Sequence, residues 1–244
     1  MLAIETKNLS KRYKTKTAVD SLNLSIKQGE LFTLLGVNGA GKTTTIKMLT
    51  CLSKPTSGDA ILLGDSIVSN PFAVKEKINI SPQETAVARN LSVKENLEFS
   101  ARIYGFDRKE TASKVQEMLD TFSLAEVSQN KAKTLSGGMQ RRLSIAMALI
   151  SDPQILFLDE PTLGLDVIAR RQLWSVIEKL KGDITIILTT HYMEEAEALS
   201  DRIGVMSKGK LRAVGTTAEL TAKTSTGSLE DAFVSLATLE EAAG

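Results

Sequence analysis

The 244-residue sequence is poor in several residue types, and each shortage excludes something. It has one cysteine, Cys51, so no disulfide can form within the chain, which suits a reducing compartment. Aromatic residues make up only 5% of the chain, so the core must be mostly aliphatic. The 30 basic residues nearly cancel the 29 acidic residues. This balance argues against nucleic acid as a partner and against a polybasic membrane tail.

The sequence also lacks hydrophobic runs long enough to span a bilayer. Apolar stretches such as Ile155–Leu158 and Ile184–Leu188 are far shorter than the roughly 20 residues that a spanning helix needs, and they are typical of buried strands. The first residues, Met1–Glu5, become charged at once and contain no apolar region of a signal peptide. We therefore expect a soluble, cytoplasmic protein, for which any association with a membrane must come through a partner.

Short aliphatic runs alternate with amphipathic stretches along most of the chain. This pattern predicts an α/β fold, in which a parallel sheet is covered by helices. Strands are predicted at Leu22–Ile26, Glu30–Leu35, Ala60–Leu63, Gln154–Leu158, Ile184–Thr189 and Ile203–Met206. Helices are predicted at Lys42–Leu52, Met139–Ile150, Ile168–Leu180 and Thr217–Lys223.

The middle of the chain has a different character. Ser92 and Glu95 have the spacing of a capping box, and so do Asp107 and Glu110. Apolar residues follow each box at roughly helical intervals. We therefore interpret residues from about 84 to 134 as helical.

These patterns suggest how the chain is divided. Residues 1–226 are expected to form one main domain, with a helical subdomain inserted at about residues 84–150. Residues 227–244 are expected to form a short helical tail, because Leu229–Ala237 is amphipathic.

A phosphate-binding loop is the strongest motif in the sequence. The segment Gly36–Thr43 fits the pattern G-x-x-x-x-G-K-[ST] and lies between an apolar strand and a helix. Its glycines let backbone N–H groups turn towards phosphates, and the helix start adds a favourable dipole. Lys42 would add positive charge near the terminal phosphates of ATP, and the Thr43 hydroxyl can bind Mg²⁺. The loop residues expected to bind ATP are Gly36, Asn38, Gly39, Ala40, Gly41, Lys42, Thr43 and Thr44.

Two carboxylates follow a predicted buried strand. The run Ile155–Leu158 ends abruptly in Asp159 and Glu160. Unpaired charges are costly inside a strand, so both are expected at its carboxyl end, where open parallel sheets bind their ligands. Asp159 is then suited to bind Mg²⁺, and Glu160 to orient and deprotonate the attacking water. A solvated turn after a core strand is the alternative, which the phosphate-binding loop in the same chain disfavours.

The segment Leu135–Gln140, with the sequence L-S-G-G-M-Q, resembles the signature segment of ATP-binding cassette (ABC) proteins. Taken alone, it indicates only a helix that is capped by Ser136. The resemblance extends over nearly the whole chain. It implies a P-loop NTPase core with a mostly parallel sheet, an N-terminal antiparallel β subdomain and an inserted α-helical subdomain.

The resemblance also assigns roles to single residues. It implies that Tyr13 stacks on adenine, that Gln83 reaches the metal, and that His191 contacts the γ-phosphate as a catalytic residue. Without it, Tyr13 is an ordinary strand tyrosine, and His191, the only histidine, is an ordinary hydrogen-bonding residue at a strand end. The signature residues implied to bind ATP across a dimer are Ser136, Gly137 and Gly138.

The sequence departs from the family pattern in the loop after the carboxylates. Leu163 stands where the family usually has Ser, which puts a hydrogen bond across the dimer in doubt, whereas Asp166 is intact. Val37 replaces a common Pro at a position that tolerates variation.

The function implied by the resemblance is that of a transporter subunit. Two cassettes would pair head to tail, as a homodimer or a homologous heterodimer, and Mg·ATP hydrolysis would drive separate transmembrane permease subunits. The tail Ser228–Ala237 resembles that of the drug-efflux and sodium-extrusion exporters, which favours export. A non-transport cassette and a P-loop kinase are the alternatives. One phosphate loop, no sustained heptads and balanced charge disfavour the first, and the signature segment disfavours the second.

Overall fold

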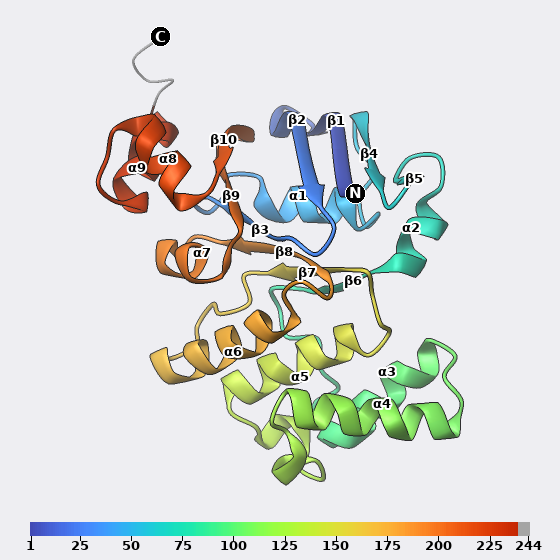
Figure 1. The fold of residues 1–244 in the computed structure, drawn as a ribbon. Coiled ribbons are helices and arrows are strands. Elements are labelled where there is room, and N and C mark those ends of the chain that lie inside the picture. Colours follow the sequence, from blue (N-terminus) through green and yellow to red (C-terminus); the bar gives the residue numbers. More distant parts are fainter. Residues whose placement is uncertain (239–244) are drawn as a thin grey trace.

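The computed structural model describes residues 1–238, whose strands form two sheets. The smaller sheet is antiparallel, with the strand order β2-β1-β4-β5. Its strands are β1 (Leu2–Tyr13), β2 (Lys16–Lys27), β4 (Ser57–Leu62) and β5 (Asp65–Ser66). Figure 1 shows this sheet on one side of the molecule, above helix α1 (Lys42–Leu49).

The larger sheet contains the strands that position the site. Its order is β10-β9-β3-β8-β7-β6, and every neighbouring pair is parallel except β9 with β10. The strands are β3 (Leu31–Leu35), β6 (Ile78–Ser81), β7 (Ile155–Asp159), β8 (Thr185–Thr190), β9 (Arg202–Ser207) and β10 (Lys210–Gly215). A mostly parallel sheet with a separate antiparallel sheet confirms the predicted α/β fold class.

Alternate residues of the large sheet pack on opposite layers. Ile155 and Phe157 of β7 join a core with Ile46 of α1 and the small sheet. Leu156 and Leu158 join a second core with the helices of the other layer. Both faces of the sheet are therefore buried, as expected for parallel strands.

The second layer consists of helices that lie together below the sheet in Figure 1. They are α3 (Val93–Ile103), α4 (Arg108–Thr121), α5 (Gly137–Leu149) and α6 (Val167–Leu180). Capping boxes start α3 at Ser92 and α4 at Asp107, as the sequence predicts. Residues 84–92 contain no helix, so the prediction of a helix-rich stretch from residue 84 is wrong at its beginning.

The remaining helices lie at the periphery. They are α2 (Pro71–Lys77), α7 (Met193–Leu199), α8 (Thr217–Thr224) and α9 (Leu229–Thr238). Phe233 and Leu236 of α9 pack with Leu220 of α8 and Val205 of β9, so the tail is helical as predicted through residue 238. The last part of the predicted tail, residues 239–244, lies outside the described residues.

Two further findings bear on the predictions. Helix α1 ends at Leu49 instead of the predicted Leu52, because Thr50 is the C-cap and Cys51 has a left-handed backbone with φ of 57°. Among residues 1–238, none of the helices combines the length and the apolar character needed to cross a membrane.

Candidate functional site

The phosphate-binding loop connects β3 to α1, and close contacts require glycine at two of its positions. A Cβ atom on Gly36 would lie 2.5 Å from the Met206 carbonyl oxygen. Gly41 has a φ of 109°, and a Cβ there would lie 2.6 Å from the Ala18 carbonyl oxygen. A side chain at either position would therefore displace the loop from the strands behind it.

Lys42 begins α1 and is buried within the site. Its Nζ lies 2.5 Å from the Gly36 carbonyl oxygen and 3.0 Å from Glu160 Oε1. The side chains of Lys42 and Glu160 are only 5% and 6% exposed. Two opposite charges removed from water in this way interact strongly, so each holds the other in place.

Asp159 ends β7 next to the start of α1. Its Oδ1 accepts hydrogen bonds from Thr189 Oγ1 at 2.5 Å and Thr43 Oγ1 at 3.3 Å. A carboxylate beside a threonine hydroxyl is the oxygen donor set that Mg²⁺ prefers. No group of three or more His, Cys, Asp or Glu side chains suited to a metal occurs in residues 1–238. The Asp159 carboxylate and the Thr43 hydroxyl fit a Mg²⁺ ion, since Mg²⁺ is usually bound by one or two protein oxygens and takes its other ligands from phosphate and water.

Glu160 follows β7 directly and joins Lys42 to His191. Its Oε2 lies 2.8 Å from His191 Nδ1, and His191 follows the last residue of β8. The backbone N–H of Glu160 donates to the carbonyl and hydroxyl oxygens of Thr189 at 3.1 and 3.0 Å. Glu160 has a φ of 48°, which non-glycine residues rarely adopt. Strands β7 and β8, neighbours in the sheet, thus bring these groups to one edge.

A cavity of about 420 Å³ opens over this edge. Gln83, which follows β6, and Tyr13, which ends β1, both line it, as does Glu160. The Tyr13 side chain is 46% exposed. The other residues around the cavity are Lys16, Ala18 and the loop residues Asn38, Gly39, Ala40, Gly41, Lys42, Thr43 and Thr44. The sequence prediction missed Lys16 and Ala18, which reach the cavity from the neighbouring strand β2.

The signature residues lie apart from this cavity. Ser136 caps α5 by accepting a hydrogen bond from the Met139 N–H, and Gly137 begins the helix. Ser136 and Gly138 line a separate surface hollow of about 320 Å³ with Asp166. A Cβ on Gly138 would lie 2.8 Å from the Ala169 Cβ atom, so a glycine lets α5 approach α6 closely.

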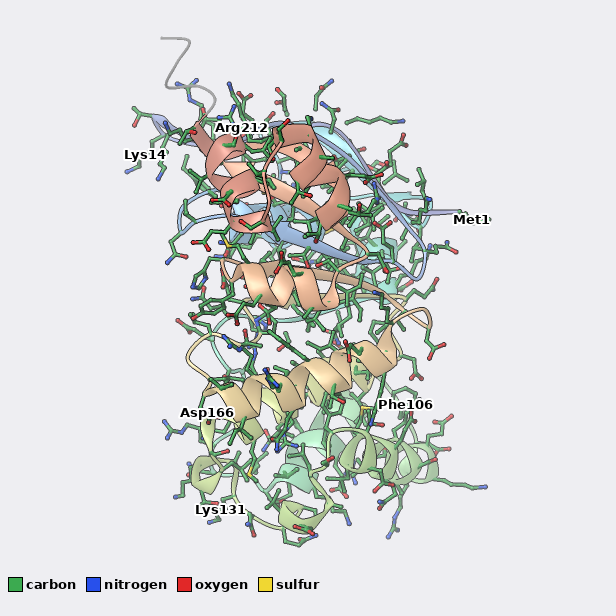
Figure 2. The ribbon with its side chains drawn as sticks, turned by 60° about the vertical axis from the view of Figure 1, so that its left-hand side comes forward. Met1, Lys14, Phe106, Lys131, Asp166 and Arg212 are labelled. Atoms are coloured by element: carbon green, nitrogen blue, oxygen red, sulfur yellow. The ribbon has the colours of Figure 1, made fainter. Side chains whose placement is uncertain are left out.

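Asp166 caps α6, accepting hydrogen bonds from the N–H groups of Ile168 and Ala169. Figure 2 labels it at the start of α6, on the helical side of the large sheet, and labels Lys14 at the tip of the β1–β2 hairpin. Leu163, in the loop before α6, is 41% exposed. Because the signature residues line a different hollow from the phosphate-loop cavity, one chain does not bring them to its own phosphate loop.

These features define a nucleoside-triphosphate-binding protein of the P-loop class. The sequence profile described as "ABC transporter" matches residues 19–163. The daunorubicin/doxorubicin resistance ATP-binding protein DrrA of Streptomyces peucetius is 42% identical over 227 residues, covering 93% of this chain and 68% of DrrA. The phospholipid-transporting ATPase ABCA3 of Homo sapiens is 42% identical over 228 residues, but these cover 92% of this chain and only 13% of ABCA3.

Solved structures agree with the sequence relatives. The ATP-binding subunit of an ABC transporter matches with a TM-score of 0.85 at 27% identity, covering 96% of this chain and 99% of the other. A dimeric ATP-binding cassette in a post-hydrolysis state with ADP and Pi matches with a TM-score of 0.79 at 27% identity, covering 87% and 98%. The chain therefore belongs to the ABC transporter family, as an ATP-binding ATPase domain.

Proposed function

We propose that this chain binds Mg·ATP in the cavity above the phosphate loop and hydrolyses it to drive export through separate membrane-spanning subunits. The observation that carries the proposal is the chain of contacts from Lys42 through Glu160 to His191. It places a cation, a carboxylate and an imidazole side by side where the γ-phosphate of ATP would lie.

The roles of the residues follow from their chemistry. Tyr13 stacks on the adenine, while the loop N–H groups and Lys42 hold the phosphates. Thr43, Asp159 and Gln83 would hold Mg²⁺, which supplies charge neutralisation to the phosphate oxygens when bound. Glu160 accepts the proton of the attacking water. His191 orients Glu160 and contacts the γ-phosphate.

A second cassette is needed to complete each site. The signature residues Ser136, Gly137 and Gly138 present donor groups at a helix start, which is an anion-binding arrangement. Within one chain they lie outside the nucleotide cavity, so they would bind the ATP of a partner cassette in a head-to-tail pair. The dimeric post-hydrolysis cassette with a similar fold supports this arrangement.

The permease partner is proposed to dock on a groove beside the Gln83 loop. This groove, of about 230 Å³, lies between the beginning of that loop, α3 and α5. Phe99, Ile103 and Tyr104 line it and are 56, 64 and 50% exposed. Large apolar side chains gathered in a groove at the surface are typical of a protein interface. Such docking would place the chain on the cytoplasmic face of the membrane.

The direction of transport is proposed from the tail and the relatives. The resemblance of the tail to those of exporters favours export, and α9 packs against the domain as a defined helix. DrrA is named for resistance to two drugs, which is compatible with outward transport. ABCA3 is named for phospholipid transport, so apolar or amphipathic cargo is the chemistry that these relatives suggest.

The substitution Glu160→Gln tests the proposed role of Glu160 as the base. The neutral amide keeps the shape of the side chain but cannot take a proton from water. We expect kcat for ATP hydrolysis to fall by about 10²- to 10⁴-fold, while the Kd for ATP changes little. Phosphate release and ATP titration on the full chain measure the two quantities.

The exposed Glu194, in α7, supplies a matched control, and Glu194→Gln should hydrolyse ATP at the wild-type rate. Wild-type turnover by the Glu160→Gln variant would remove Glu160 from its role and with it the proposed mechanism.

A further inference from the structure

Arg141, in the second turn of α5, is a buried cation whose partners are all backbone carbonyl groups. Its Nε donates to the Pro161 oxygen at 2.9 Å, and its Nη2 donates to the Asp159 oxygen at 2.9 Å. Its Nη1 donates to the oxygen of Pro82 and, at 3.5 Å, to that of Gln83. One guanidinium group therefore connects α5, the turn after β7 and the loop after β6.

The charge of Arg141 is held without an ion pair in the part of the chain that the structure describes. The residue is 4% exposed. Burial lowers the pKa of Arg141 to about 10, against the opposing attraction of Asp159 and Glu195, so the side chain stays charged at neutral pH. A buried cation that is satisfied by carbonyl dipoles fixes their directions, because losing any of these bonds would leave charge unsolvated.

The two carbonyl groups bound by Arg141 in the catalytic turn belong to Asp159 and Pro161, the residues on either side of Glu160. Glu160 has a left-handed backbone, with a φ of 48°, and its own N–H is bound by Thr189. Its backbone is thus fixed at three points. Without the guanidinium group, the turn would be free to relax towards a less strained conformation.

We propose that Arg141 is a positioning residue for ATP hydrolysis, which holds Glu160 in its strained turn and connects it to the Pro82–Gln83 loop. The inference rests on the proposed role of Glu160 as the base. Arg141 does not itself reach the nucleotide cavity, whose lining residues do not include it. Its effect on the reaction is exerted through the backbone of Glu160.

The same contacts connect the proposed docking groove to the reaction. Pro82 lines that groove, and so do Ser144 and Ala148, which lie one and two turns beyond Arg141 on α5. A segment of the permease seated in the groove would press on both the helix and the loop that Arg141 joins. Movement of either would change the hydrogen bonds beside Glu160, so docking would regulate hydrolysis through Arg141.

The test uses Arg141→Met, which keeps length and burial but removes all donors, and Arg141→Lys, which keeps the charge but not the planar fork. We expect kcat of the Met variant to fall by about 10²-fold, because small displacements of a reacting group have effects of this size. The Kd for ATP should stay within about threefold of wild type. The Lys variant should recover part of kcat, since an ammonium group can bind some of the carbonyl oxygens.

Arg202 supplies the matched control. It too binds a backbone carbonyl, that of Ser25, and it pairs with Glu30 at 2.7 Å, away from the cavity. Arg202→Met should lower the melting temperature without lowering kcat. Equal losses of kcat in the two Met variants would show a general stability effect and would overturn the proposal.

A double substitution separates this inference from the proposed function. If Arg141 acts through Glu160, Arg141→Met should cause no further loss of single-turnover rate in a Glu160→Gln background. A multiplicative loss would overturn the inference. Wild-type turnover by Glu160→Gln alone would overturn the proposed function, whereas an inactive Glu160→Gln beside a fully active Arg141→Met would overturn only the inference. If Arg141→Met does not fold, the same cycle with Arg141→Lys decides.

Discussion

Glu195 is a further buried carboxyl group close to the catalytic turn, in addition to Asp159 and Glu160. It lies in α7, has no exposed surface and accepts a hydrogen bond from Trp174 Nε1 at 3.0 Å. Burial raises the pKa of Glu195. Hydrogen bonds with Thr190, Thr162 and Trp174 oppose this rise, and the charge of Glu160 adds to it. The folded protein therefore binds the Glu195 proton more tightly than the unfolded chain does.

This shift makes stability depend on pH in a defined direction. The stability that protonated Glu195 contributes is fully present below its ordinary pKa near 4.5 and is lost as pH rises through the raised value. Glu195→Gln keeps an acceptor for Trp174 and never ionises. The difference in free energy of unfolding between the Glu195→Gln variant and wild type should therefore be more favourable to the variant at about pH 8 than at about pH 5. Urea denaturation at both pH values measures the difference, and a difference that does not vary with pH would contradict the assignment.

The control for this experiment is Glu194→Gln, one residue earlier. The Glu194 side chain is 73% exposed, although it pairs with Arg170 at 3.1 Å. Solvent screens such a pair, so its removal should change stability by less than about 1 kcal/mol and with little dependence on pH. The comparison isolates the effect of burial from the effect of removing a carboxylate.

At the scale of whole elements, α3 and α5 form the sides of the proposed docking groove. Phe99 and Ile103 lie one turn apart on α3, and both line the groove. The double substitution Phe99→Asp and Ile103→Asp places two charges on this apolar surface, which a partner would have to desolvate. We expect the variant to lose at least about tenfold in recovery of the permease after co-expression, measured by pull-down from solubilised membranes.

An exposed apolar residue elsewhere gives the control for that surface. Val234 of α9 is 55% exposed, and Val234→Asp should recover the permease as wild type does. Equal recovery by the α3 variant, with ATP titration confirming that it is folded, would place the docking surface elsewhere.

Helix starts and strand ends were the elements most visible in the sequence. The capping boxes at Ser92 and Asp107 have purely local signals, and both begin helices in the structure. The end of α1 was predicted three residues late, because Thr50–Lys54, the residues directly after Leu49, include neither Gly nor Pro. Strand β1 was not predicted as an element. Its pairing with β2 contains four register shifts, which interrupt the alternation of apolar residues.

The site residues also differ in whether a local sequence pattern indicates them. Lys42 lies in the phosphate-binding loop motif, and Asp159 lies at the end of a predicted strand. Both were therefore predicted at the same edge of the sheet. Arg141 contacts Pro82 and Pro161, which are 59 and 20 residues away along the chain. No periodic or local pattern reports contacts of this kind, and Arg141 was therefore missed.

At the scale of the whole molecule, the separation of the signature residues from the phosphate loop requires two chains for one site. Ser136→Arg places a long charged side chain where the ATP of the partner would bind. We expect ATP-dependent dimers of the chain to be lost on gel filtration, in a Glu160→Gln background that slows turnover. ATP binding by the monomer should stay within about threefold of the parent variant.

Loss of ATP binding together with dimerisation would contradict a composite site, because a residue outside the monomer cavity should not affect its own nucleotide. Gln172→Arg is not a suitable control, because Gln172 lines the same hollow as Ser136. Arg171→Glu, on the exposed face of α6, is the better control, and it should still form dimers.

The left-handed backbone of Glu160 affects which substitutions this position can accept. Ten non-glycine residues in the described part of the chain have positive φ, and Glu160 alone among them is buried. Such a conformation costs about 1–2 kcal/mol, which glycine would avoid. Glu160→Gly would also leave the buried Lys42 without its carboxylate partner, which costs more than the backbone strain that glycine relieves. Durability and turnover therefore both select against glycine at this position.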